Sequence, residues 1–312
     1  MNKIIVYNLE PNYYSEKAKQ IWIENNFDYV EGCFEEISDY NKCDRVEILI
    51  IKLKNYIDKS ILKYFKNLKY ILTATTGTVH LSSEILNHNK LKVFSLKNQK
   101  SFLENITSTP ELTWGLLLAI YRNIHTSYRD VLRGNWDRDN FFGHQLFNKT
   151  IGIIGLGRVG LQIAKYAEAF RMNILYYDPN VNNIKYKKLN KIEDVFSQSD
   201  IISIHVHVTE STRNMINSKL LSLCKKETII INTSRGEIWN EYDVINALRL
   251  GQIKGIATDV ISDETLSLEK SPIWINRKNY NILITPHIAG ASFDALEMCE
   301  LKVQSNFLNQ FK

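Results

Sequence analysis

The 312-residue sequence contains only four cysteines, and no two of them are spaced as in a metal-binding or redox motif. Zinc sites and thiol–disulfide centres usually present paired cysteines as C-x-x-C, so this spacing argues against a zinc site and against a disulfide framework. We interpret the four residues as reduced thiols of a cytoplasmic protein. They are Cys33, Cys43, Cys224 and Cys299.

Long apolar runs and dense basic blocks are also missing. The first apolar run, Met1–Tyr7, is too short for a signal peptide or a membrane span, so we interpret it as a first β-strand. The formal net charge of +5 comes from lysines scattered along the chain. Such scattering disfavours nucleic acid and membranes as partners, and it suits a mildly positive site for small acidic metabolites.

No internal repeat or low-complexity tract is present, and the length predicts about two domains. Short apolar runs alternate with helical patterns, which predicts an α/β fold with parallel sheets covered on both faces. In the first hundred residues we expect strands at 3–7, 47–51, 69–73 and 92–94, and helices near 14–24, 57–65 and 82–86. A long apolar helix should then begin with Thr109 as N-cap and Pro110 at the first helical position. Its body should run to Ile124 as a buried element.

The segment from Thr150 to Asp178 is the most specific feature of the sequence. A short apolar strand leads into Gly155, Gly157 and Gly160, whose spacing is G-x-G-x-x-G. A helical pattern, a second strand and an acidic residue follow. A lone glycine motif is weak evidence, whereas this complete order of elements is typical of a dinucleotide-binding unit. The alternative is a plain α/β turn that happens to contain glycines.

The three glycines and the acid have separate physical roles in such a unit. Gly155 permits a tight turn, Gly157 lets a pyrophosphate approach the backbone, and Gly160 lets the helix and the strand pack closely. The helix N-terminus attracts the phosphates, and Asp178 would bond to the ribose hydroxyls and repel a 2′-phosphate. We therefore expect NAD, with NADP less favoured. Three lysines that could weaken this preference follow: Lys185, Lys187 and Lys188.

Four further strands are expected at 200–205, 228–232, 255–258 and 281–285, with helices near 192–196, 217–223 and 241–250 and a last amphipathic helix over 291–311. Three chemically matched residues follow the ends of the last three strands: Arg235, Glu264 and His287. Ligands of doubly wound sheets bind outside the carboxyl ends of the strands, so the three side chains should share one site. Taken singly, each could equally be an ordinary loop residue.

This set of side chains suits the reduction of a 2-oxo acid. The arginine can bind a carboxylate or polarise a carbonyl oxygen, and the histidine can give a proton to that oxygen as hydride arrives. A carboxylate paired with the histidine raises its pKa and fixes its tautomer.

The sequence resembles the D-isomer-specific 2-hydroxyacid dehydrogenase family, which contains phosphoglycerate dehydrogenases, glyoxylate/hydroxypyruvate reductases and D-lactate dehydrogenases. The resemblance covers essentially the whole chain. It is carried by five segments: KTIGIIGLGRVG (149–160), TESTRNMIN (209–217), INTSRG (231–236), ATDV (257–260) and TPHIAG (285–290). The segments 111–115 and 134–136 also fit the family.

The resemblance implies two doubly wound parallel-sheet lobes, with a Rossmann NAD-binding domain inserted into a flavodoxin-like substrate domain. Residues 1–100 would form the first part of the substrate-binding domain, 101–288 the NAD-binding domain, and 289–312 a helix returning to the substrate-binding domain. Catalysis would take place in the cleft between the lobes. The implied assembly is a homodimer joined through the cofactor domain.

The resemblance also implies roles for individual residues. Arg235 would bind and polarise the substrate, His287 would act as acid and base, and Glu264 would be its partner. Backbone N–H groups at 74–78 would cradle the substrate carboxylate, and Asp259 would contact the nicotinamide carboxamide. The full cofactor-binding set is Gly155, Gly157, Arg158, Val159, Gly160, Asp178, His205, Val206, Thr212, Thr233, Ser234, Arg235, Asp259, His287 and Gly290. The substrate-binding set is Thr76, Gly77, Thr78, Arg235 and His287.

Some residues depart from the family pattern. Val79 stands where the family usually has Asp, so the loop that would set substrate identity is unusual. The alternating His205 and His207 would also allow a metal site, but we favour a strand edge that lines the cofactor cleft and expect no metal. Lys52 and Lys54 leave phosphate recognition open, and the sequence does not distinguish among 2-oxo acids.

We therefore predict an NAD-dependent oxidoreductase that interconverts a small 2-oxo acid and its D-2-hydroxy acid by hydride transfer. The alternative is an NAD(H)-sensing, non-enzymatic binding protein of the corepressor type on the same fold. The complete arginine, glutamate and histidine set argues against that alternative. Formate or phosphite oxidation is a third hypothesis, and Glu264 counts against formate.

Overall fold

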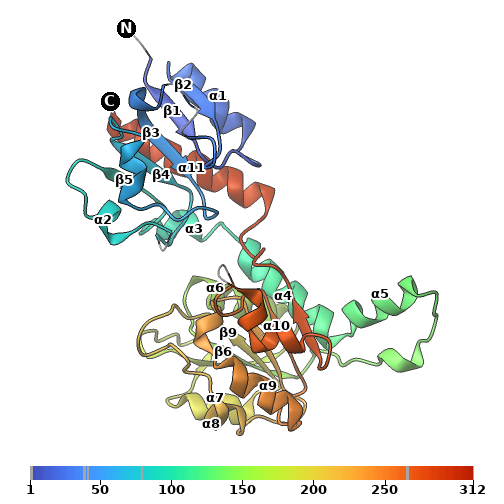
Figure 1. The fold of residues 1–312 in the computed structure, drawn as a ribbon. Helices are drawn as coiled ribbons and strands as arrows, with labels where there is room; N and C mark the ends of the chain where they lie inside the picture. The colour runs from blue at the N-terminus through green and yellow to red at the C-terminus, as the bar shows by residue number, and fades with distance from the viewer. Residues whose placement is uncertain (1–2, 38–39, 41, 79, 265–266, 312) are drawn as a thin grey trace. The chain divides into compact units, whose positions relative to one another are not determined.

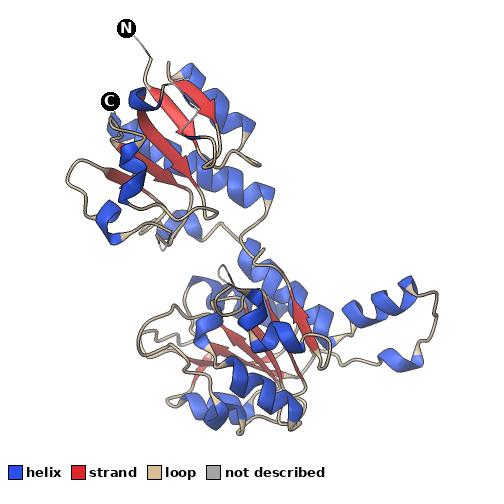
Figure 2. Cartoon of the chain, in the orientation of Figure 1, coloured by secondary structure: helices blue, strands red, loops and turns tan. Residues whose placement is uncertain are grey.

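The computed structural model describes residues 3–37, 40, 42–78, 80–264 and 267–311. The chain divides into two compact units (Figure 1): Met1–Ile106 with Ala291–Lys312, and Thr107–Gly290. These divisions lie a few residues from the expected domain boundaries. Each unit contains one parallel sheet flanked by helices (Figure 2), as the alternation of apolar runs and helical patterns predicts.

The first unit has a five-stranded parallel sheet in the order β2-β1-β3-β4-β5. This is the flavodoxin-like order, which confirms the expected fold of this part. Its strands are β1 Ile5–Asn8, β2 Asp28–Glu31, β3 Val46–Ile51, β4 Tyr70–Thr73 and β5 Lys92–Phe94. Its helices are α1 Glu16–Glu24, α2 Ser83–Leu86, α3 Lys100–Leu103 and α11 Phe293–Phe311, with 3-10 turns η2 Cys43–Arg45 and η3 Lys59–Lys63.

Both faces of this sheet are buried, which explains the nearly continuous apolar run of β3. Ile48 packs with the cluster that contains Trp22 and Phe307, whereas Leu49 packs with the cluster that contains Phe65. Phe307 belongs to the carboxy-terminal helix α11, which lies against the sheet of this unit. Its ring centroid is 5.6 Å from that of Trp22, so the last helix completes the core.

The second unit has a seven-stranded parallel sheet in the order β12-β11-β10-β9-β6-β7-β8. The strands are β6 Thr150–Ile154, β7 Asn173–Tyr177, β8 Lys187–Lys188, β9 Ile201–Ile204, β10 Ile229–Asn232, β11 Gly255–Thr258 and β12 Ile282–Ile284. The order reverses between β6 and β9, so the switch point of this doubly wound sheet lies beside the glycine turn that follows β6.

The helical elements of the second unit cover this sheet and extend from it. They are α4 Ser108–Tyr121, α5 Ile124–Leu132, α6 Arg158–Ala169, α7 Ile192–Gln198, α8 Ser218–Leu221, α9 Glu241–Arg249 and α10 Pro272–Asn276, with 3-10 turns η4 Asp139–Phe141, η5 Gly236–Ile238 and η6 Leu268–Lys270. In the portion that the structure describes, none of the helices combines the length and the apolar character that crossing a membrane requires.

The ends of α4 correct two expectations. The N-cap is Thr107, not Thr109, and its side chain makes no capping hydrogen bond. The helix ends at Tyr121 and does not reach Ile124, because Asn123 adopts a left-handed conformation with φ of 56°. Asparagine tolerates this conformation better than most residues, so an apolar pattern that continues past it does not continue the helix.

Candidate dinucleotide and catalytic site

The glycine turn after β6 is built as the motif predicts. Gly155 has φ of +87°, and a Cβ added there would lie 2.5 Å from the carbonyl oxygen of His205. A Cβ on Gly160 would overlap the carbonyl oxygen of Gly155, so α6 and the turn pack closely. At Gly157, by contrast, an added Cβ would meet nothing within 4 Å. The fold itself does not require that glycine, whereas a phosphate approaching the backbone would.

The first turn of α6 and Asp178 flank this turn. Leu161 N–H donates to Gly157 O at 2.9 Å, so the N–H groups of Val159 and Gly160 lie ahead of the first hydrogen bond within the helix. Asp178 directly follows β7 and accepts hydrogen bonds from the N–H groups of Leu156 (2.9 Å) and Asn180 (2.8 Å). A helix N-terminus beside a fixed carboxylate fits the phosphates and the ribose of a dinucleotide.

Two of the three lysines near Asp178 are engaged elsewhere. Lys185 pairs with Glu168 at 2.7 Å, and Lys188 Nζ donates to Val181 O at 2.8 Å. Lysines that already have partners are less available to a 2′-phosphate. These contacts therefore make NADP binding beside the end of β7 less favourable than the lysines alone would suggest.

Other residues of the expected cofactor set lie in the loops that follow β9 and β10. His205 Nε2 lies 2.7 Å from Ser203 Oγ, and burial lowers the pKa of His205 to about 3, so its ring is neutral. The Thr233 hydroxyl is 2.7 Å from that of Thr113 on α4, which ties the loop after β10 to that helix. Ser234 donates to Asn232, and the Thr212 hydroxyl donates to His207 O. At Gly290, which follows β12, an added Cβ would meet nothing within 4 Å.

The alternating His205 and His207 do not belong to a metal-binding group. Over the described ranges of the chain, no set of three His, Cys, Asp or Glu side chains is arranged to hold a metal ion. His205 is instead occupied by the Ser203 hydroxyl on the same strand end.

Arg235, Glu264 and His287 follow three neighbouring strands, β10, β11 and β12, whose carboxyl ends share one edge of the sheet. His287 Nδ1 is hydrogen bonded to the Glu264 carboxylate. That bond raises the pKa of His287 above its ordinary value, while burial and the nearby Arg235 guanidinium act to lower it. The structure therefore brings all three expected catalytic side chains within electrostatic reach of one another.

The loops that carry Arg235 and Glu264 touch through their backbones. A Cβ added to Gly236 would overlap the carbonyl carbon of Ile261, so only glycine permits this approach. The same region is held by Glu241, which is buried and accepts hydrogen bonds from Ser262 N–H (2.7 Å) and Ser271 Oγ (2.5 Å). Sequence reasoning missed Glu241, because an acid in the first turn of a helix is ordinary and carries no signal of this role.

Asp259 holds the loop that carries His287. This carboxylate is 1% exposed and accepts hydrogen bonds from Thr285 Oγ1 (2.5 Å), Ile288 N–H (2.9 Å) and Ala289 N–H (2.7 Å). His287 itself has φ of 54°, a left-handed conformation that costs a non-glycine residue about 1–2 kcal/mol. We infer that the hydrogen bonds to Asp259 stabilise this unusual backbone and so orient the imidazole.

The loop expected to cradle the substrate carboxylate lies in the first unit, after β4. In the part of this unit that the structure describes, the backbone N–H groups of Thr76, Gly77 and Thr78 donate to no protein acceptor. Gly77 is exposed, and an added Cβ would meet nothing within 4 Å there. Three free donors around an uncrowded glycine fit an anionic group. Val79, which departs from the family pattern, lies outside the described residues.

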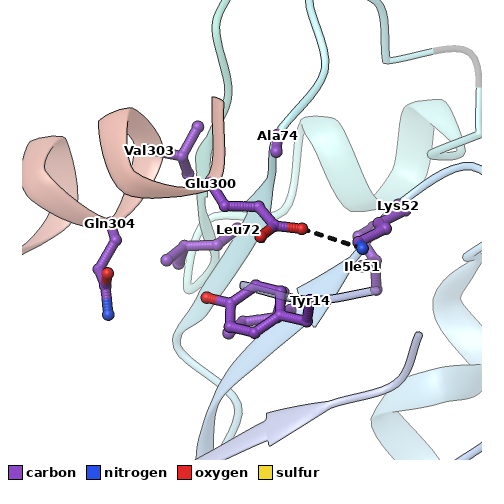
Figure 3. Close-up of a pocket in the computed structure, with 9 residues that line it drawn as sticks. Tyr14, Ile51, Lys52, Leu72, Ala74, Glu300, Val303 and Gln304 are labelled. Carbon is purple, nitrogen blue, oxygen red and sulfur yellow. Dashed lines mark ion pairs between the residues drawn. The ribbon is translucent and has the colours of Figure 1, made fainter. Parts of the chain in front are cut away.

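Lys52, at the end of β3, is not a free cation. Its ammonium is 2.9 Å from the Glu300 carboxylate of α11 (Figure 3), and Glu300 is 1% exposed. Lys52 Nζ also donates to Asn12 O at 3.0 Å, and Glu300 accepts the N–H of Ser15 at 2.8 Å. Because its charge is already paired, Lys52 is less available to a substrate phosphate than the sequence suggested.

Comparisons with known proteins concern the family and the fold. Residues 114–289 match the family model described as D-isomer specific 2-hydroxyacid dehydrogenase, NAD binding domain. The chain is 33% identical to a glyoxylate reductase of Pyrococcus horikoshii over 83% of this chain and 78% of the relative. It is also 33% identical to a D-3-phosphoglycerate dehydrogenase of Methanocaldococcus jannaschii over 85% of this chain, but it spans only about half (48%) of that relative.

A solved structure, that of the TT0316 protein from Thermus thermophilus, has the same fold. It superposes with a TM-score of 0.83 at 26% identity and covers 97% of this chain and 96% of its own. The alignment thus includes both α/β units. The chain belongs to the D-isomer-specific 2-hydroxyacid dehydrogenase family, and residues 114–289 are its NAD-binding domain.

Proposed function

We propose that the protein is an NAD-dependent oxidoreductase that interconverts a small 2-oxo acid and its D-2-hydroxy acid. One observation carries the proposal: Arg235 and the His287–Glu264 pair converge at the carboxyl edge of the sheet of the NAD-binding domain. A cation, a proton donor and its carboxylate partner are the groups that carbonyl reduction needs beside a hydride donor.

Each side chain has one role in this proposal. Bound NADH supplies the hydride to the carbonyl carbon of the substrate. His287 Nδ1 is taken by Glu264, so Nε2 is the ring nitrogen that gives a proton to the developing alkoxide and takes it back in the oxidation direction. The Arg235 guanidinium binds the substrate carboxylate or polarises its carbonyl oxygen, because its planar donors match such oxygens.

The loop after β4 in the first unit has a separate role in this proposal. The free N–H groups of Thr76, Gly77 and Thr78 bind the substrate carboxylate. The pairing of Lys52 with Glu300 favours a substrate without a phosphate group, because a phosphate dianion placed there would face a buried carboxylate. A glyoxylate-like or hydroxypyruvate-like acid fits these contacts better than a phosphorylated one.

The direct test measures NADH oxidation with a panel of acids: glyoxylate, hydroxypyruvate, pyruvate, phenylpyruvate and phosphohydroxypyruvate. We expect turnover of at least one unphosphorylated acid and weaker turnover of phosphohydroxypyruvate. A His287→Gln variant, which keeps a side chain of similar polarity without a titratable ring, serves as the catalytic control. No turnover of any acid together with tight NADH binding would favour the NAD(H)-sensing alternative.

Discrimination between cofactors is measured on the same preparation. Because Asp178 lies at the end of β7 and two nearby lysines are paired, NADH should give a higher kcat/KM than NADPH. An Asp178→Ser variant should reduce that preference. Equal use of both cofactors by the unmodified protein would contradict the role proposed for Asp178.

We also propose a homodimer that forms through α5 and the loop that follows it. In Figure 1 these segments extend away from the sheet of their unit. They expose large apolar side chains, among them Trp136 (91% exposed), Leu132 (67%) and Tyr128 (62%). A second copy of the chain would cover this surface, which is unusual on a monomer. Light scattering should give twice the chain mass, and Trp136→Asp should give monomers; a monomeric unmodified protein would contradict the proposal.

A further inference from the structure

His80 is a buried histidine for which the proposed reaction has no use. It lies beside the carboxylate cradle in the first unit and is 5% exposed. Its Nε2 is 3.1 Å from Thr73 Oγ1, which in turn is 3.0 Å from Thr75 Oγ1. The Thr75 hydroxyl then donates to Gly77 O at 2.7 Å. A chain of three hydrogen bonds therefore joins His80 to the cradle.

The direction of these bonds follows from the number of protons available. A hydroxyl has one proton, and that of Thr75 goes to Gly77 O. Thr75 must accept the proton of Thr73, so Thr73 has none left for the imidazole. His80 Nε2 must therefore carry a proton and donate it. Nδ1 is then the bare nitrogen, and it is buried without a hydrogen-bond partner in the described chain.

The last bond of the chain orients a peptide group of the cradle. The peptide unit between Gly77 and Thr78 is planar and trans, so its C=O and its N–H point in opposite directions. The Thr75 hydroxyl holds the carbonyl of Gly77, and the N–H of Thr78 must point the opposite way. That N–H has no acceptor in the described protein, which leaves it available to an anion.

We propose that His80 is a positioning residue for the substrate carboxylate, acting through Thr73 and Thr75 on the Gly77–Thr78 peptide. The proposal rests on the proposed function, because it assigns the cradle to the carboxylate of the 2-oxo acid. A histidine that served packing alone would leave Nδ1 buried and unpartnered for no gain, and an aliphatic side chain of similar size would avoid that cost. Donation from Nε2 accounts for an imidazole at this position.

The test compares two variants of similar size. His80→Gln keeps an Nε2–H donor at the same number of bonds from the backbone, whereas His80→Leu removes the donor. We expect the KM for the best 2-oxo acid to rise roughly three- to ten-fold in His80→Leu, the range that the loss of one hydrogen bond gives, with kcat and the Kd for NADH little changed. His80→Gln should stay within about two-fold of the unmodified protein, since its lost Nδ1 had no partner.

Thr73→Val tests the chain without touching the histidine. It should raise the KM as His80→Leu does, and the double variant should be no worse than either single variant, because both break one pathway. His88→Leu, at another histidine of the first unit, is the control and should leave the kinetics unchanged. Nitrogen-15 NMR of the histidine rings should show protonated Nε2 and bare Nδ1 at His80, a readout that does not depend on activity.

Three outcomes would overturn the proposal: an unchanged KM in both His80→Leu and Thr73→Val, a His80→Gln variant as impaired as His80→Leu, or protonated Nδ1 at His80. These results differ from failure of the proposed function, which would appear as an unmodified protein that turns over none of the acids.

Discussion

The carboxyl edges of the two sheets expose different kinds of group. In the second unit the loops after β10, β11 and β12 present Arg235, Glu264 and His287, whose charges act on one another. In the first unit two of the charged side chains at the corresponding edge, Lys52 and Glu10, are used within the protein. Lys52 is paired with Glu300, and the buried Glu10 carboxylate accepts the N–H groups of Lys52, Lys54 and Asn55 (3.0, 3.1 and 2.9 Å).

The two sheet edges therefore suit two different tasks, proton transfer and recognition of a carboxylate. Proton transfer requires a titratable group whose pKa is set by its neighbours. The edge of the second unit offers His287, whose pKa is raised by Glu264 and which lies near the Arg235 guanidinium. Recognition of a carboxylate requires donors held in fixed directions, and the loop after β4 offers backbone N–H groups of Thr76, Gly77 and Thr78. We therefore expect changes at the first edge to alter binding and changes at the second to alter turnover.

The largest effect is expected at His287. His287→Ala removes the group that exchanges a proton with the substrate, so turnover should fall by roughly two to four decades. Turnover should fall far more than NADH binding weakens, and stopped-flow fluorescence measures the Kd for NADH. His88→Ala in the first unit is the control. Turnover near the unmodified level would show that His287 takes no part in the reaction. It would also contradict the assignment of proton transfer to the edge of the second unit.

Arg235→Ala should have the next largest effect. Loss of a charge-assisted contact of about 1.5–3 kcal/mol corresponds to a decrease of roughly ten- to hundred-fold in kcat/KM for the 2-oxo acid. Arg235→Lys should recover only part of it, because an ammonium lacks the planar pair of donors. Steady-state kinetics with the best acid of the panel measures both variants. Identical kinetics for Ala and Lys would mean that the planar geometry of the guanidinium is not used.

Glu264→Gln should move the pH profile rather than abolish activity. The bond to Glu264 raises the pKa of His287 above its ordinary value of about 6.5, so removing the charge lowers it again. Reduction uses protonated His287 and is lost as pH rises through this pKa. The kcat/KM of the variant for reduction should therefore begin to fall at a lower pH than that of the unmodified protein.

The reverse reaction is the control for this prediction. Oxidation of the 2-hydroxy acid uses neutral His287, so in the Glu264→Gln variant it should persist to lower pH than in the unmodified protein. Profiles that move in opposite directions for the two reactions would show that Glu264 does not act through the pKa of His287.

We expect the smallest effect from Asp259→Asn, and we expect it in thermal stability. The amide can no longer accept all three hydrogen bonds that hold the His287 loop, and one unsatisfied buried donor costs about 1–3 kcal/mol. Calorimetry should show a Tm lower by a few degrees. Asp263→Asn, in the neighbouring turn, is the control, because its side chain makes no hydrogen bond in the described structure. Equal melting of the two variants would contradict the clamping role of Asp259.

Strands with buried faces could be located from sequence alone. β11 matches its expected range, Gly255–Thr258, and β7 Asn173–Tyr177 is the second strand expected between the glycine turn and Asp178. A short apolar run between turn residues has few alternatives to a buried strand. The edge strands β2 and β8 were missed: Asp28–Glu31 and Lys187–Lys188 are only partly buried and carry no continuous apolar run. The segment at 57–65 was expected as a helix, and only the 3-10 turn Lys59–Lys63 forms there.

The sequence by itself determined the fold class, the glycine turn, and the identity of the side chains that follow each strand. These features are local, since they depend on spacing along the chain and on the rule that parallel strands end at one edge. Only the tertiary structure decided which of those side chains remain available. Lys52 is occupied by Glu300, a carboxylate near the other end of the chain, and the loop of His287 is held by Asp259, which follows the neighbouring strand. Hydrogen bonds and ion pairs between distant segments form only after the sheet has brought them together, so no local pattern in the sequence records them.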